Sequence, residues 1–214
     1  MLSVLKKAHH SAYPELGITY IVTPANFEYV EAFFLNHIDL SLLNYVSIEL
    51  QSYVTQTQSD AYAAVMKQKF AIQQTPCADA YVRNPALFAS INFESLAQQM
   101  QRVAEACALR GIVFHSQPTT LTTDNIRHYF SANWQDLSDR KNRCAVPWIA
   151  AEISARGEVS TCHSFYDLSL GNIHEQPLLT IWRGDRMKQL REHLRGELFP
   201  ICTACCRYYD GVAT

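Results

Sequence analysis

The hydrophobic positions in the first two thirds of the chain switch between the spacing of strands and the spacing of helices. Three short apolar stretches are rich in β-branched and aromatic residues, as strands are; they are Gly17–Val22, Tyr45–Leu50 and Gly111–Ser116. After the first of these, Thr23-Pro24 is a helix start signal, because threonine is a good N-cap and proline suits the first helical position. The helical positions that follow are Phe27, Val30, Phe33 and Phe34, all on one face. This pattern predicts a strand–helix–strand unit, which favours parallel strands with a right-handed crossover.

Helical spacing predicts three more helices before residue 143. They cover Ala61–Phe70, Phe93–Arg110, which Gly111 ends, and a shorter stretch over Thr123–Ser131. Between the first two, Thr75–Asn92 contains two prolines and is predicted to be irregular. Strands alternating with helices indicate an α/β fold.

Each predicted strand is polar on one side near its C-terminal end, whereas strands buried in a parallel sheet are usually apolar on both faces. The polar positions that share a face are Thr19 with Thr23, then Ser47, Glu49 and Gln51, then His115 with Gln117. If these faces line a barrel, its interior could hold a ligand, because ligands in such barrels sit at the C-terminal ends of the strands. An open or incomplete sheet with one solvated face would produce the same pattern.

From Cys144 onward the chain changes to short elements placed between cysteines. The predicted elements are a β-hairpin of Ile149–Ser154 and Glu158–Thr161 turning at Arg156-Gly157, a second turn at Gly171-Asn172, and a helical stretch from Leu178 to Leu194. Cys144 and Cys162 flank the hairpin, and Cys202 and Cys205 form a C-x2-C pair just after Pro200.

Four cysteines in this order favour a metal center. Thiolates are soft ligands suited to zinc, copper(I) or iron–sulfur clusters. A C-x2-C turn places two sulfurs on one center, and two distant cysteines can complete a set of four. Zinc ribbons usually use two such turns and this chain has one, which argues against zinc, but spacing alone leaves a cluster, structural zinc and free thiols open. Of the remaining cysteines, Cys77 and Cys107 are predicted to be packed or free thiols, and Cys206, beside Cys205, is predicted to be a plain thiol or a spare ligand.

Composition and charge give no support to a nucleic-acid-binding, membrane or disulfide-stabilised secreted protein. The chain of 214 residues has 18 basic and 20 acidic side chains, a near balance that gives no argument for a nucleic-acid or membrane partner. No apolar run approaches the roughly 18–20 residues that span a bilayer, and no signal peptide is recognised. Seven cysteines are an odd number, which argues against a disulfide framework. We therefore expect a cytoplasmic protein.

Several features of the cysteine-rich segment agree in order with one known family. They are C-x12-G-x4-C from Cys144, Pro147-Trp148, Gly171-Asn172-Ile173, Ile181-Trp182 and the terminal C-x2-C. With these features, residues 144–208 resemble the SPASM/twitch auxiliary domain of radical SAM enzymes. The resemblance implies one auxiliary 4Fe–4S cluster on Cys144, Cys162, Cys202 and Cys205. The further cysteines of a two-cluster SPASM domain are missing.

The upstream part resembles the same family more generally. Gly17–Pro24 with the helix after it is similar to the fourth strand and helix of a radical SAM barrel, and Tyr45–Gln51 and Ile112–Gln117 are similar to the fifth and sixth strands. The resemblance implies a partial, half TIM-type barrel over residues 1–143, followed by a small SPASM/twitch domain over residues 144–214 with a β-hairpin and a helix. It also makes three side chains candidate barrel-interior contacts for S-adenosylmethionine or substrate: Glu49, His115 and Thr23.

One part of the family pattern is absent from this sequence. The C-x3-C-x2-C loop, which holds the cluster that chelates S-adenosylmethionine, does not occur. The prediction is therefore the C-terminal part of a radical SAM/SPASM-type protein that cannot cleave S-adenosylmethionine alone, and whether this chain is itself an enzyme stays open. S-adenosylmethionine would bind only when a partner chain supplies the missing half-barrel, and the family implies a peptide or small-molecule substrate. The alternatives are a non-catalytic iron–sulfur electron-transfer or accessory protein, and a structural zinc-binding protein.

Overall fold

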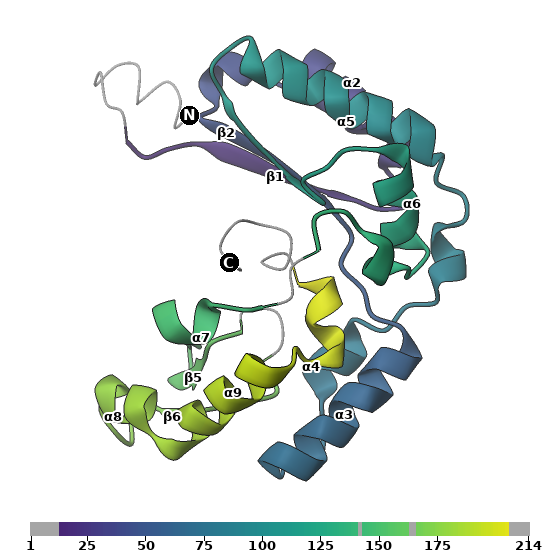
Figure 1. Ribbon diagram of the computed structural model, residues 1–214. Coiled ribbons are helices and arrows are strands. Elements are labelled where there is room, and N and C mark those ends of the chain that lie inside the picture. Colours follow the sequence, from purple (N-terminus) through teal and green to yellow (C-terminus); the bar gives the residue numbers. More distant parts are fainter. Residues whose placement is uncertain (1–12, 141–142, 163–165, 206–214) are drawn as a thin grey trace. The chain divides into compact units, whose positions relative to one another are not determined.

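A computed structural model describes residues 13–140, 143–162 and 166–205, and Figure 1 shows its ribbon. The chain divides into two compact units. We call residues 1–51 and 85–139 the sheet unit, and residues 52–84 and 140–214 the cysteine unit. The sequence pattern placed residues 52–84 in the first domain, but in the structure they pack with the cysteine-rich segment. Among the described residues, no helix is long and apolar enough to cross a bilayer.

The sheet unit is built on three parallel strands in the order β1-β2-β3. The strands are β1 (Gly17–Val22), β2 (Tyr45–Leu50) and β3 (Val113–Gln117). The predicted parallel α/β arrangement is therefore confirmed, and the first two strands have their predicted bounds. The third begins two residues later than predicted, because Gly111 has a φ of 66° and belongs to the turn after the preceding helix.

Short and long helices of the sheet unit cover one face of this sheet. They are η1 (Phe27–Tyr29), α2 (Val30–Ala32), η2 (Phe33–His37), η3 (Leu40–Leu42), η4 (Pro85–Phe88), α5 (Phe93–Ala108), α6 (Thr123–Phe130) and η5 (Trp134–Asp136). Helices α2 and α5 lie side by side (Figure 1). Gln99 of α5 joins them, since its amide donates to the Phe27 carbonyl at 3.1 Å and accepts from the Glu31 N–H at 3.3 Å.

The helix predicted to start at Thr23-Pro24 forms only in part. The Thr23 carbonyl accepts hydrogen bonds from the N–H groups of Asn26 and Phe27, which makes a turn there. Successive 3₁₀, α and π turns then replace one regular helix. The predicted apolar face is still buried at Phe27, Val30 and Phe34.

The cysteine unit combines a small antiparallel sheet with helices from both of its segments. Its elements are α3 (Gln56–Phe70), α4 (Pro76–Ala80), α7 (Val146–Ile149), β4 (Glu152–Ile153), β5 (Glu158–Ser160), β6 (Gly171–Asn172), α8 (Leu178–Arg183), α9 (Asp185–Gly196) and η6 (Pro200–Ala204). The β4–β5 hairpin was predicted, although its first strand is shorter because α7 occupies residues 146–149. Gly171-Asn172, predicted as a turn, instead pairs with β5 as a third strand. The predicted long helix is broken at Gly184, whose backbone is extended.

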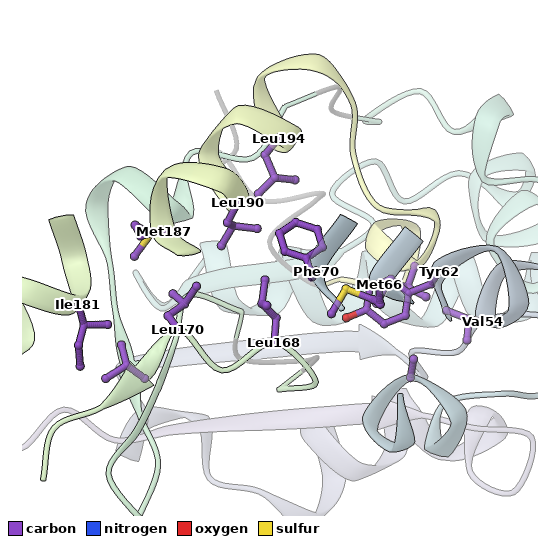
Figure 2. Close-up of a cluster of buried hydrophobic side chains, with 13 residues drawn as sticks. Val54, Tyr62, Met66, Phe70, Leu168, Leu170, Ile181, Met187, Leu190 and Leu194 are labelled. Carbon is purple, nitrogen blue, oxygen red and sulfur yellow. The ribbon is translucent and has the colours of Figure 1, made fainter. Parts of the chain in front are cut away.

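The core of the cysteine unit joins residues far apart in the sequence (Figure 2). Tyr62, Met66 and Phe70 repeat every four residues along α3, so they form one buried stripe. This stripe packs with buried residues of the C-terminal segment, which are Val159, Leu168, Leu170, Ile181, Met187, Leu190, Leu194 and Ile201. Helix α3 therefore belongs to the core that surrounds the cysteines.

Candidate metal centre

The β4–β5 hairpin sets the positions of the first two cysteines. It turns at Gly157, whose φ of 81° lies in the left-handed region and whose N–H donates to the Ser154 carbonyl at 2.9 Å. A Cβ at this position would lie 2.5 Å from the His174 ring, so only glycine fits. Strand β5 then leads into Cys162, whose N–H donates to the Ser160 hydroxyl at 3.1 Å. Cys144 lies at the other end of the hairpin, just before α7, which leads into β4.

Helix α7 is anchored to α9, which steadies the chain after Cys144. The Arg191 side chain donates to the carbonyl oxygens of Pro147 at 2.9 Å and Trp182 at 3.1 Å. Its guanidinium lies 4.5 Å from the centroid of the Trp182 ring, a cation–π distance. One arginine thus joins three elements of the cysteine unit.

Cys202 lies on the 3₁₀ turn η6, and Cys205 is the residue directly after it. Pro200 starts this turn, the Cys202 N–H donates to the Phe199 carbonyl at 2.9 Å, and the Cys205 N–H donates to the Cys202 carbonyl at 3.1 Å. Gln58 of α3 holds the same turn from outside, since its amide nitrogen donates to the Thr203 hydroxyl at 2.8 Å and the Pro200 carbonyl at 3.2 Å.

All four predicted ligands line one pocket in the cysteine unit. Its volume is about 70 Å³, several times the roughly 10–15 Å³ that one water molecule requires. Most of the remaining wall is apolar: Val146, Pro147, Leu168, Leu190, Leu194, Phe199 and Ile201. Three residues with hydroxyl groups complete it, namely Tyr62, Ser160 and Thr161. The structure therefore brings Cys144, Cys162, Cys202 and Cys205 together, as the predicted center requires.

The surroundings of Cys144 and Cys202 disfavour the charged forms of these two thiols in the protein alone. Burial raises the pKa of the Cys144 thiol, although a backbone hydrogen bond from Val146 opposes this. Burial, and then the charges of Cys162 and Cys144, raise the pKa of Cys202. A bound cation reverses this preference, because thiolates are the ligating form and metal binding releases their protons. The donor set and the shared pocket thus fit a cationic metal center.

Four thiols in one pocket could ligate either of two kinds of metal center. A single zinc ion would need its sulfurs at about 2.3 Å from one point. An iron–sulfur cluster spreads its thiolates over several irons. Among the described residues, no group of three Cys, His, Asp or Glu side chains is placed around one point.

The other cysteines have different surroundings. Cys107 is buried on α5 in the sheet unit, as its apolar helix face predicts. Cys77 is the second residue of α4, and its N–H donates to the Asp167 carboxylate at 2.8 Å. Neither lines the cysteine pocket. Cys206 lies outside the described residues.

The predicted barrel-interior side chains lie in the sheet unit, on or just after its strands. The strand register pairs Ser47 with His115 and Glu49 with Gln117, so these four side chains share one face. Glu49 is half-buried and accepts from the Ser47 hydroxyl at 3.3 Å, and His115 is exposed. Gln117 is buried, and its side-chain amide has no hydrogen-bond partner among the residues that the structure describes.

Thr23, the third predicted barrel-interior residue, makes hydrogen bonds to residues just after it in the chain. Thr23 follows β1, and its hydroxyl accepts from the Ala25 N–H at 3.3 Å while its own N–H donates to the Asn26 side chain at 2.7 Å. These bonds form a turn at the end of the strand. A contact of Thr23 with a ligand stays a prediction.

Sequence reasoning missed the two α3 residues that reach the cysteine region, Gln58 and Tyr62. The signal for the start of α3 was present, because Thr55 and Gln58 form a capping box. The helix therefore begins at Gln56, five residues before its predicted start at Ala61. The repeat of Tyr62, Met66 and Phe70 could have indicated a buried face, but no local pattern shows what that face packs against.

Comparison with known families assigns the cysteine-bearing segment. The model of the SPASM iron-sulfur cluster-binding domain matches residues 144–206, a span that includes all four pocket cysteines and does not reach α3. Comparisons with curated proteins and with solved structures found no match. The match supports the predicted SPASM domain and, with it, the binding of an iron–sulfur cluster by this part of the chain.

Proposed function

We propose that the cysteine unit binds one 4Fe–4S cluster through Cys144, Cys162, Cys202 and Cys205. The observation that carries this proposal is the single, mostly apolar pocket lined by all four thiols. The cluster would supply one-electron redox chemistry when bound. The protein's own contribution is to hold two sulfurs beside the β4–β5 hairpin and two at η6, and to line the pocket with aliphatic side chains, which also influence the cluster potential.

We further propose that the chain is the C-terminal part of a radical SAM/SPASM-type protein, with the sheet unit as part of its TIM-type barrel. Three parallel strands with helices on one face support this, and so does the polar opposite face near the strand ends. The buried amide of Gln117 adds support, because a buried polar group without a partner indicates a missing one. Glu49, His115 and Thr23 are the proposed contacts for a ligand at these strand ends.

The proposed barrel is completed by a segment that this sequence lacks. In the strand order β1-β2-β3 both outer strands have a free edge in the described residues, and free edges pair readily with further strands. Cleavage of S-adenosylmethionine would need the C-x3-C-x2-C loop, which the sequence does not contain. A further segment or partner chain would supply it, and a peptide or small molecule would be the substrate. The second candidate is a non-catalytic iron–sulfur electron-transfer module, which the cysteine pocket would also support.

Anaerobic reconstitution with iron and sulfide tests the proposed cluster. We expect about four irons and four sulfides per chain and a broad absorbance near ~400 nm. Serine variants of Cys144, Cys162, Cys202 and Cys205, made singly, should each lose most of this iron. Cys107→Ser is the matched control, because Cys107 is a buried thiol of the sheet unit.

Two outcomes would contradict the cluster. One is stoichiometric zinc with no iron in protein handled without oxygen, which would establish the structural zinc alternative. The other is equal iron loss in Cys107→Ser and the four pocket variants, which would mean that iron binds elsewhere or nonspecifically. A mixing experiment distinguishes the radical SAM hypothesis from the accessory-protein hypothesis. The reconstituted chain is mixed with a candidate protein that contains C-x3-C-x2-C, and only the radical SAM hypothesis predicts cleavage of S-adenosylmethionine.

A further inference from the structure

Helix α3 is part of the cysteine pocket although it lies outside the SPASM match. It begins more than seventy residues before Cys144 and is fixed at its start by the Thr55–Gln58 capping box. Gln58 uses both ends of its amide: the oxygen accepts from the Thr55 N–H at 3.0 Å, and the nitrogen donates to Pro200 and Thr203 on η6. The same side chain therefore orders the helix and holds the C-x2-C turn.

Tyr62 follows Gln58 by one helical turn, so it lies on the same side of α3. It is 2% exposed and lines the pocket together with all four cysteines. Figure 2 shows it beside Met66, in the same cluster of buried side chains as Leu168 of the C-terminal segment. Residues outside the SPASM match thus bring a phenol to the wall of the pocket.

The phenol of Tyr62 keeps its proton in this environment. Burial raises its pKa most, and the charges of Asp167, Cys162, Cys202 and Cys77 raise it further. A protonated phenol can donate a hydrogen bond, while thiolate and sulfide sulfurs accept one. The Ser160 hydroxyl, also in the wall, donates to the Cys162 carbonyl at 3.3 Å and accepts from the Cys162 N–H at 3.1 Å.

We propose that the Tyr62 hydroxyl donates a hydrogen bond to a sulfur of the bound cluster or of its cysteine ligands and thereby raises the reduction potential of the cluster. The proposal rests on the proposed function, because it requires a cluster in this pocket. Reduction adds negative charge to the cluster, so a donor at its sulfurs stabilises the reduced state more than the oxidised state. Tyr62 would tune the cluster without ligating it, so its removal should change the midpoint reduction potential and leave the iron content unchanged.

The test compares Tyr62→Phe with wild type after anaerobic reconstitution of the full chain. Potentiometric titration followed by electron paramagnetic resonance gives the midpoint potential of each protein. Tyr53→Phe is the matched control, because Tyr53 is a fully buried tyrosine that does not line the pocket. We expect similar iron and sulfide content in all three proteins and a more negative midpoint potential in Tyr62→Phe alone.

Equal potentials in Tyr62→Phe, Tyr53→Phe and wild type, with the cluster present in each, would overturn the tuning role and leave the proposed function standing. If Tyr62→Phe does not hold its cluster, 3-fluorotyrosine placed at position 62 decides. This residue has nearly the same shape and is a stronger donor, so it should shift the potential to a more positive value, and no shift would overturn the proposal. Wild type without iron would overturn the proposed function and this inference together.

Discussion

The sheet unit buries its core under helices that are neighbours of its strands in sequence, whereas the cysteine unit closes its core with segments far apart in the chain. In the sheet unit, η1 and α2 follow β1 and α5 precedes β3. In the cysteine unit, α3 packs against η6, and the Gln58–Thr203 bond joins residues 145 positions apart. The first arrangement follows from local periodicity, while the second depends on contacts that no local pattern specifies.

The two units also differ in what they leave open. The sheet unit has one face with half-buried or exposed polar side chains, such as Glu49 and His115, and two free strand edges among the described residues. The cysteine unit instead gathers its four half-buried cysteines around one mostly apolar pocket. An open sheet suits completion by further chain, and a mostly apolar pocket suits a redox center whose potential depends on its surroundings.

The largest effect on stability is expected from replacing one buried methionine by alanine in each unit. Met66 of α3 and Met100 of α5 are both 0% exposed, so replacing either by alanine should cost about 2–5 kcal/mol of unfolding free energy. We expect Met66→Ala alone to lower the iron content, because Met66 belongs to the core around the cysteines. Denaturant unfolding and iron analysis of both variants measure the two effects.

Met100→Ala is the control for general destabilisation, since it removes the same side chain from the sheet unit. If both variants lost iron to the same extent at the same stability, cluster binding would follow overall stability. The distinction between the two units would then have no functional meaning.

A smaller effect is expected from removing one helix-capping amide in each unit. Gln58→Ala deletes the capping-box partner and the two bonds to η6, and should cost about 1–2 kcal/mol. Asn92→Ala deletes the cap of α5, which accepts from the Ser95 N–H at 3.0 Å, and should cost about 1 kcal/mol. Cluster loss to a chelator, followed by absorbance, should be faster in Gln58→Ala than in wild type.

Asn92→Ala should lose its cluster at the wild-type rate, because its cap lies in the sheet unit. Equal rates in Gln58→Ala and wild type would show that the C-x2-C turn holds its shape without α3. The helix would then support the core only through its apolar stripe.

Local signals predicted much of the fold. The strands β1 and β2 were placed at their bounds because each is a short β-branched stretch between turn residues. Helix α5 was placed within two residues of its observed end, because Gly111 lies just beyond it. Local signals failed where strand pairing determines the secondary structure. Gly171-Asn172 has the composition of a turn and is a strand only because it pairs with β5.

The sequence predicted that four cysteines come together, but it did not predict the other side chains that line their pocket. Cysteine spacing and family resemblance placed Cys144, Cys162, Cys202 and Cys205 together, and the pocket contains all four. Gln58 and Tyr62 were missed, because an amphipathic helix shows that one face is buried without showing its neighbour. A shared core between residues 52–84 and the C-terminal segment is a property of the tertiary fold.

The smallest expected effect is a difference in the pH at which each unit loses stability. In the cysteine unit, His193 is buried, and burial and then the charge of Lys69 lower its pKa, with Glu197 opposing. The neutral form is therefore favoured on folding. Its stability is complete above the usual histidine pKa of about 6.5 and is lost as the pH falls from there through the lower folded value.

In the sheet unit the sensitive group is Asp139. Burial acts to raise its pKa, but hydrogen bonds from the Thr120 N–H and the side chains of Thr119, Ser138 and Asn125 together lower it. The ionised form is favoured on folding, so its contribution is present above the usual aspartate pKa of about 3.9 and is lost as the pH falls below it. The acid sensitivity of the cysteine unit should begin at a higher pH.

Denaturant unfolding of wild type, His193→Gln and Asp139→Asn across pH 3–8 separates the two groups. The stability difference between wild type and His193→Gln should shrink or turn against wild type as the pH falls below about 6.5, because only wild type must bury a group that gains a proton on unfolding. The difference between wild type and Asp139→Asn should stay constant over that range and shrink only below about pH 4. Both differences changing in the same pH window would mean that one shared transition, and not the separate surroundings of His193 and Asp139, sets the acid response.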